Sequence, residues 1–289
     1  MKLAVASGKG GTGKTTVATN LALVASSSLS VQLLDCDVEA PNCHIFVKPK
    51  IISSEAVSVP VPKIDERLCT GCGRCGEICE FSAIVCIKPA GNMNGKARVL
   101  VFPELCHGCG GCTMACPAGA ISETNRLVGT VSVGETQSFD FTYGRLRIGE
   151  AMSPPLIRRV REKENGSQLT IVDAPPGTSC PVVSAVNGCD YACLVTEPTP
   201  FGLNDLVLAV EMIQQLGVLV GVVVNRCDIG DNRIRKYCES MDIPILCEIP
   251  DDRRIAEAYA KGELILEALP DLREVFENLL EVIVGQLEK

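Results

Sequence analysis

The sequence has no tryptophan and two histidines, and it lacks the features that mark membrane proteins and nucleic-acid-binding proteins. No apolar run approaches the roughly 18 residues that a membrane span requires, since even residues 216–224 are interrupted by glycine. The 35 acidic side chains outnumber the 27 basic ones, and the net charge of -8 argues against a large nucleic-acid-binding face. We therefore expect neither a membrane nor a nucleic acid as partner.

Histidine chemistry and secretion are also disfavoured. Neither His44 nor His107 has the neighbours that a metal ligand or a general base would need. The N-terminal segment has no basic stretch, apolar run and small-residue cleavage site of a secretory signal. We therefore expect a cytoplasmic protein, in which the 17 cysteines stay reduced and serve as thiols or metal ligands.

Apolar segments alternate with helical patterns in both terminal parts of the chain. Short apolar runs without polar alternation are typical of strands that are covered on both faces. They predict an α/β fold with a mostly parallel sheet and helices on both faces. The strands are expected at 2–7, 31–35, 169–172, 191–196, 218–224 and 243–247, and the helices at 15–25, 204–216, 231–240, 251–260 and 270–287.

The middle of the chain has a different character. Two cysteine runs, which begin at Cys69 and Cys106, have identical spacing and are 37 residues apart (106 minus 69), and an Ala-Ile pair follows each. Two copies fit a small pseudo-symmetric domain better than a solenoid. We expect a small α+β insert at 60–125 that interrupts one α/β domain formed by 1–59 and 126–289.

A glycine-rich segment follows the first predicted strand and has the pattern of a phosphate-binding P-loop. Its amides and the helix N-terminus would surround phosphate oxygens, Lys14 would reach the β and γ phosphates, and Thr15 would ligate Mg²⁺. Asp173, at the end of an apolar strand, would complete the Mg²⁺ shell, as in P-loop NTPases. The expected nucleotide-binding residues here are Gly8, Lys9, Gly10, Gly11, Thr12, Gly13, Lys14, Thr15 and Thr16.

The cysteine runs have the C-x₂-C-x₂-C-x₃-C spacing of bacterial ferredoxins, in which the fourth thiolate of each run reaches the other [4Fe–4S] cluster. Zinc prefers paired cysteine knuckles, and disulfides do not suit a reducing compartment. Glu80 stands where the pattern has proline after Cys79, and a carboxylate there would lower the potential of that cluster. Cluster 1 would use Cys69, Cys72, Cys75 and Cys116, and cluster 2 would use Cys106, Cys109, Cys112 and Cys79.

The second lysine of the P-loop makes the segment resemble the deviant loop of MinD/ParA-type ATPases, which include Mrp-type iron–sulfur carriers and the nitrogenase iron protein. Residues 35–42 resemble switch I, and residues 173–178 resemble switch II. The resemblance implies an ATP-driven homodimer in which Lys9 crosses to the partner's nucleotide, Asp37 positions the attacking water and Gly177 senses the γ phosphate. It also implies that Asn225, Arg226, Pro250 and Asp251 flank the adenine. The implied catalytic set is Lys9, Lys14, Asp37 and Asp173.

The other nine cysteines are expected to be thiols. Cys180 lies where the nitrogenase iron protein has a cysteine of a cluster shared across its dimer axis, but residues 145–169 hold no second cysteine, so a buried thiol is favoured. The C-terminal stripe at 272–283 is acidic and predicts core packing rather than membrane binding. A buried thiol is likewise expected at Cys36, Cys43, Cys86, Cys189, Cys193, Cys227, Cys238 and Cys247.

The whole pattern resembles MinD-type ATPases that carry an inserted ferredoxin domain. We expect an Mg²⁺-dependent ATPase in which a dimer switch gates electron transfer through two [4Fe–4S] clusters to a redox partner protein. The first alternative is a carrier that assembles iron–sulfur clusters and delivers them to a partner protein. The second is a spatial-positioning ATPase, which the acidic charge disfavours.

Overall fold

The computed structural model describes residues 1–87 and 97–287 and divides into two compact units. The first unit comprises 1–55, 130–145 and 156–289, and the second comprises 56–129 and 146–155. The predicted insert at 60–125 lies within the second unit, which starts earlier and also takes in a segment after residue 145.

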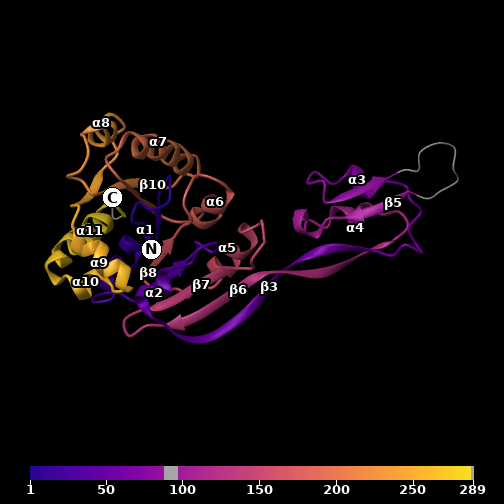
Figure 1. Cartoon of the computed structure of the whole chain (residues 1–289), viewed down its shortest axis with the longest axis horizontal. Coiled ribbons are helices and arrows are strands. Elements are labelled where there is room, and N and C mark those ends of the chain that lie inside the picture. Colours follow the sequence, from indigo (N-terminus) through magenta and orange to yellow (C-terminus); the bar gives the residue numbers. More distant parts are fainter. Residues whose placement is uncertain (88–96, 288–289) are drawn as a thin grey trace. The chain divides into compact units, whose positions relative to one another are not determined.

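A nine-stranded sheet has the order β11-β10-β9-β1-β8-β2-β7-β6-β3 (Figure 1). The pairs formed among β1, β2, β7, β8, β9, β10 and β11 are parallel, so the predicted mostly parallel sheet is confirmed. The strands are β1 (Lys2–Ala6), β2 (Val31–Asp35), β3 (Lys50–Ile64), β6 (Ile121–Glu135), β7 (Asp140–Leu146), β8 (Leu169–Asp173), β9 (Tyr191–Thr196), β10 (Leu219–Asn225) and β11 (Ile245–Ile249).

Helices cover both faces of the parallel strands. In β1, Leu3 and Val5 belong to a core that includes side chains of α1 and α11, whereas Ala4 is equally buried and faces the opposite side. On that side α6 packs against β1 and β8, and α7 packs against β9 and β10. The helices of the first unit are α1 (Lys14–Ala25), α2 (Cys43–Val47), α5 (Pro154–Arg161), α6 (Cys180–Val186), α7 (Pro200–Gln215), α8 (Arg233–Ser240), α9 (Arg253–Lys261), α10 (Ile265–Ala268), η2 (Pro270–Leu272) and α11 (Arg273–Leu287).

The acidic C-terminal helix packs in the core, as the stripe predicted. Phe276, Leu279 and Ile283 are 1%, 0% and 0% exposed, and they join the same core as α1. Within the described residues, no helix combines the length and apolar character needed to cross a membrane.

The second unit contains a small antiparallel sheet of two strands with two short helices beside it (Figure 1). Cys75, Ile84 and Ile121 form its small core. Its elements are α3 (Arg74–Glu77), β4 (Ile84–Ile87), β5 (Arg98–Val101), η1 (Pro103–Leu105) and α4 (Gly111–Ala115).

The strands β3, β4, β5, β6 and β7 were not predicted from the sequence. In β3 the alternation of buried Val57, Val59 and Val61 with more exposed neighbours is the period of two that marks a strand with one buried face. Prolines at 60 and 62 weakened that pattern, but proline is tolerated because β3 lies at the edge of the sheet.

Candidate functional site

A cavity of about 370 Å³ in the first unit lies against the P-loop and the residues that follow β10 and β11. Ligands of open parallel sheets bind outside the carboxyl ends of the strands, which is where these segments meet. The sequence-predicted residues that line the cavity are Gly10, Gly11, Gly13, Lys14, Thr15, Thr16, Asp37, Asn225, Arg226, Pro250 and Asp251. Gly8, Lys9, Thr12, Asp173 and Gly177 are not in its lining.

The P-loop needs glycine where it approaches other segments. Gly13 has φ +97°, and a Cβ there would lie 2.5 Å from Asn225 Nδ2. That amide donates to the Thr12 carbonyl at 2.9 Å, so Asn225 holds the loop as well as lining the cavity. At Gly8 a Cβ would lie 2.1 Å from the Asp205 carbonyl oxygen of α7. Both contacts require a residue without a side chain.

Thr15 and Asp173, which were predicted to bind Mg²⁺, lie together. Thr15 Oγ1 donates to Asp173 Oδ2 at 2.7 Å. Asp173 is fully buried, and its Oδ1 has no hydrogen-bond partner within the described residues. Burial raises the pKa of Asp173 to about 6, while the Thr15 hydroxyl and the Lys14 ammonium oppose that shift. An unpaired buried carboxylate oxygen beside a hydroxyl fits a hydrated Mg²⁺ ion, which takes oxygen ligands.

Asp35 and Cys43 are part of this site and were not assigned to it from the sequence. Asp35 is buried and accepts from the N–H groups of Asp37, Asn42 and Cys43 at 3.1, 3.1 and 3.0 Å. Burial and then the Asp173 charge raise the pKa of Asp35 well above its usual value. The Cys43 thiol lies 3.2 Å from Asp173 Oδ2. The Asp-Cys-Asp sequence at 35–37 could have indicated this role for Asp35. The Asp35 carboxylate holds the loop closed, and that loop carries Asp37.

Asp37 is half-buried in the cavity lining, and burial raises its pKa while Lys14 lowers it. The Gly177 N–H, predicted to sense the γ phosphate, donates to the Ser7 carbonyl at 3.0 Å. Lys9, predicted to act across a dimer, lies with its Nζ 3.4 Å from Glu197 Oε2. Both groups thus have partners within this chain.

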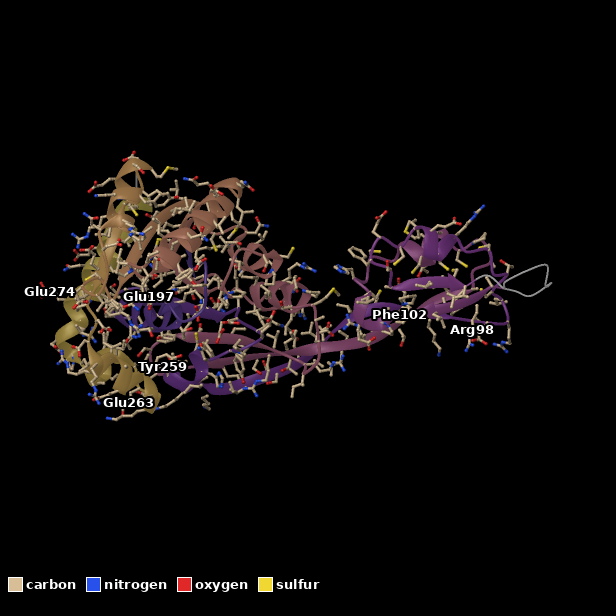
Figure 2. All side chains as sticks on the ribbon, turned by 45° about the horizontal axis from the view of Figure 1, so that its top comes forward. Arg98, Phe102, Glu197, Tyr259, Glu263 and Glu274 are labelled. Carbon is tan, nitrogen blue, oxygen red and sulfur yellow. The ribbon has the colours of Figure 1, made fainter. Side chains whose placement is uncertain are left out.

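An aromatic side chain completes the cavity and was also missed. Tyr259 of α9, labelled in Figure 2, lines the cavity, and its ring centroid lies 4.7 Å from that of Phe46. Its hydroxyl is 3.5 Å from Asn42 Nδ2, in the segment that resembles switch I. A half-exposed ring in such a cavity offers a surface on which a base can stack.

The second unit contains two further cavities, each lined by four cysteines. Cys69, Cys72, Cys75 and Cys116 line one with Ile64, Val99 and Ile121. Cys79, Cys106, Cys109 and Cys112 line the other with Phe81, His107 and Glu123. The fold therefore brings the fourth cysteine of each run to the other run. Four thiols around one small cavity match the donor set of a [4Fe–4S] cluster.

The remaining cysteines lie outside these cavities. Cys36, Cys43, Cys189, Cys193 and Cys238 are buried, as predicted, and Cys86, Cys227 and Cys247 are partly buried. The expectation for Cys180 was wrong, because this residue is exposed at the start of α6. Apolar residues follow it in the sequence, but Cys180 begins the helix, whose buried side chains are Val182, Ala185 and Val186.

Known proteins resemble this chain over nearly its whole length. The chain is 32% identical over 291 residues to an uncharacterized protein of Methanocaldococcus jannaschii, covering 98% of each. It is 25% identical over 307 residues to an iron–sulfur cluster carrier protein of Pyrococcus abyssi, covering all of this chain and 87% of that protein.

Among solved structures, the septum site-determining protein MinD complexed with Mg-ADP, from Pyrococcus horikoshii, superposes with a TM-score of 0.61 at 18% identity. The alignment covers 98% of this chain and 95% of that one, which establishes a common fold. The sequence profile of the CobQ/CobB/MinD/ParA nucleotide-binding domain matches residues 3–265. This chain therefore belongs to the CobQ/CobB/MinD/ParA family of nucleotide-binding P-loop proteins.

Proposed function

We propose that the protein is an Mg²⁺-dependent ATPase whose nucleotide-driven homodimer gates electron transfer through two [4Fe–4S] clusters. The observation that carries the proposal is the pair of cavities, each lined by four cysteines taken from both runs. A nucleotide-sized cavity in the same chain supplies the switch. When bound, the clusters would serve as one-electron carriers.

The nucleotide end of the proposal rests on the charges of the first unit. Lys14 is buried and would contact the β and γ phosphates, while Thr15 and Asp173 would hold Mg²⁺. Asp37 would orient the attacking water, because it lines the cavity close to the P-loop. Lys9 would reach the nucleotide of a second subunit after leaving Glu197.

The order of segments along the chain supports coupling between nucleotide and clusters. The loop that carries Asp37 leads into α2, and β3 begins at Lys50, three residues after α2 ends at Val47. The second unit begins within β3, at Ala56. A change in the Asp37 loop would therefore act on the strand that enters the cysteine-bearing unit.

Anaerobically prepared protein tests the proposal. We expect eight irons and eight sulfides per chain, ATP-dependent dimerisation and ATP hydrolysis that requires Mg²⁺. Redox titration and electron-transfer rates to a low-potential acceptor are then compared with and without Mg·ATP. Unchanged cluster potentials together with unchanged electron-transfer rates would rule out coupling between nucleotide binding and electron transfer.

A cluster carrier is the second candidate, because the relative at 25% identity is named as an iron–sulfur cluster carrier. Transfer requires labile ligation, whereas four cysteines per cavity favour retention. Mixing the holoprotein with an apo-ferredoxin distinguishes the two. Fast and stoichiometric transfer of iron and sulfide supports the carrier, and retention of the clusters over hours supports electron transfer.

A further inference from the structure

The two cysteine-lined cavities differ at a pair of positions that the internal repeat makes equivalent. The 37-residue offset that relates Cys69 to Cys106 also relates Cys86 to Glu123. The first copy thus has a thiol where the second has a carboxylate. Cys86 contacts the predicted ligand Cys75 of its own copy, and Glu123 lines the same cavity as the predicted ligand Cys112.

Cys86, on β4, does not line the cavity of cluster 1 but contacts one of its predicted ligands, Cys75. Its Sγ is 3.7 Å from Cys75 Sγ and 3.7 Å from the Gly73 carbonyl oxygen. A cluster ligand is a thiolate, which accepts hydrogen bonds and does not donate them. The Cys86 thiol donates to the Gly73 carbonyl in this structure, and a Cys75 thiolate at the same 3.7 Å distance, being a charged acceptor, would draw that hydrogen toward itself once a cluster is bound.

Glu123, on β6, lines the cavity of cluster 2 directly. Its Oε1 accepts from Thr113 Oγ1 at 3.4 Å, and Thr113 follows the predicted ligand Cys112. A Cβ built on Gly110 would lie 3.4 Å from the same Oε1, so the carboxylate sits against the ligand loop. It adds a negative charge beside this cavity.

The other charges near the second cavity do not reproduce this difference. Glu80, which was expected to lower the potential, is exposed and does not line the cavity. Arg126 donates to the Cys106 carbonyl at 3.4 Å, but it is buried in an ion pair with Glu150, which Arg147 also approaches at 3.8 Å. His107 stacks on Phe81 with ring centroids 3.6 Å apart.

Among the described residues, none that lines the first cavity carries a charge. Apart from its cysteines, the described residues that line it are apolar side chains, glycine and Thr70. Reduction adds one negative charge to a cluster, so its free energy responds to hydrogen bonds and charges at the ligand sulfurs. A thiol hydrogen bond favours the reduced state, and a carboxylate disfavours it.

We infer that Cys86 and Glu123 are tuning residues that set the two clusters at different reduction potentials, with cluster 1 higher and cluster 2 lower. One electron would then pass downhill from reduced cluster 2 to oxidised cluster 1, without any bond being made or broken. A low-potential one-electron donor protein supplies that electron to cluster 2. The inference rests on the proposed function, since it requires both clusters.

Redox titration of the holoprotein at pH 8.5, followed by electron paramagnetic resonance, tests the assignment. In Glu123→Gln the lower of the two one-electron steps moves to higher potential and the upper step stays. In Cys86→Ala the upper step moves to lower potential and the lower step stays. Cys86→Ser keeps a hydrogen-bond donor, so the potential of its upper step lies between those of Cys86→Ala and the wild type. The double variant Cys86→Ala/Glu123→Gln brings the potentials of the two steps together.

Glu80→Gln is the matched control, because it removes an equal charge from an exposed side chain that is adjacent in sequence to Phe81 but, unlike the equally exposed Glu123, does not line the cavity. Neither step moves in this variant. Iron analysis accompanies every titration. A wild type with fewer than eight irons overturns the proposed function and this inference together.

Eight irons with both steps unmoved in Glu123→Gln and Cys86→Ala overturn this inference alone. A shift of equal size in Glu80→Gln also overturns it, because bulk charge would then explain the effect. Loss of iron in Cys86→Ala would identify Cys86 as a ligand and would contradict its tuning role.

Discussion

Glu197 Oε2 lies 3.4 Å from Lys9 Nζ, so the lysine that would cross a dimer interface is held by a carboxylate of its own chain. The other oxygen of Glu197, labelled in Figure 2, lies 3.2 Å from Arg226 Nη1, and Arg226 lines the nucleotide cavity. Arg226 also pairs with Asp251 at 3.4 Å. A chain of charges therefore joins Lys9 to the part of the cavity predicted to hold the base.

Removing that carboxylate charge should favour the dimer. In Glu197→Gln, Lys9 no longer gives up an ion pair when it leaves, so half-maximal dimerisation needs less ATP. A partly exposed ion pair is worth about 0–1 kcal/mol, so the ATP concentration at half-maximal dimerisation should decrease by up to about fivefold. Sedimentation velocity across an ATP series measures it. The control is Glu257→Gln, whose carboxylate pairs with the exposed Arg253 outside this chain of charges. An unchanged or higher ATP requirement in Glu197→Gln would contradict a restraining role for the Lys9–Glu197 ion pair.

The buried carboxyl of Asp173 should make the metal-free protein less stable as pH rises. Its folded pKa of about 6 exceeds the ordinary aspartate pKa of 3.8, so between these values the folded state keeps a proton that the unfolded state has lost. Stability from this group is therefore present at low pH and is lost as pH rises through about 6. Asp173→Asn removes this loss, so the free energy of unfolding should rise by roughly 1–3 kcal/mol at pH 7.

Urea unfolding in EDTA at pH 5 and pH 7, followed by circular dichroism, checks this prediction. The advantage of Asp173→Asn over the wild type should be larger at pH 7 than at pH 5. Asp190→Asn is the control, since that carboxylate accepts from the Lys2 N–H at a solvent-exposed position. A larger advantage at pH 5 would reverse the sign and rule out the proposed protonation.

Tyr259 should contribute to nucleotide affinity through its ring. Tyr259→Ala removes the half-exposed ring from the cavity lining and its contact with Phe46. Loss of one stacking surface costs about 1–3 kcal/mol, so affinity for ATP should fall on the order of tenfold. Tyr259→Phe should retain most of it. Calorimetric titration measures both, with Tyr237→Ala on α8 as the control; equal affinity in Tyr259→Ala and the wild type would exclude a contact with the base.

Removing two ligands from one cavity should empty that cavity alone. Cys72→Ala/Cys75→Ala leaves Cys69 and Cys116, too few to hold a cube, so iron should fall from eight to about four per chain. The control is Cys193→Ala, because that thiol is fully buried in β9 and touches neither cavity. Iron and sulfide assays measure the result. Complete loss of iron at retained secondary structure would mean that the two cavities do not bind independently.

The sequence alone predicted the P-loop residues and cysteines that line the three cavities, because the P-loop and the cysteine runs depend on local spacing. A P-loop closes within eight residues after a strand, and the cysteine runs fix their ligand types over eleven residues. The parallel strands other than β7 were also predicted, since a strand buried on both faces needs an unbroken apolar run. The strands β3 and β6 escaped prediction because partial burial gave them a mixed pattern that proline and serine interrupted.

Only the tertiary structure decided which distant groups meet. Asp35 and Cys43 come from opposite ends of one loop, and they reach Asp173 because β2 pairs with β8. Glu197 follows β9, and the parallel pairing of β9 with β1 brings its carboxylate beside Lys9. The repeat makes Cys86 and Glu123 equivalent in sequence, but only the fold places Cys86 against Cys75 and Glu123 in the lining of the other cavity. Contacts of this kind depend on strand order and register, which no local pattern encodes.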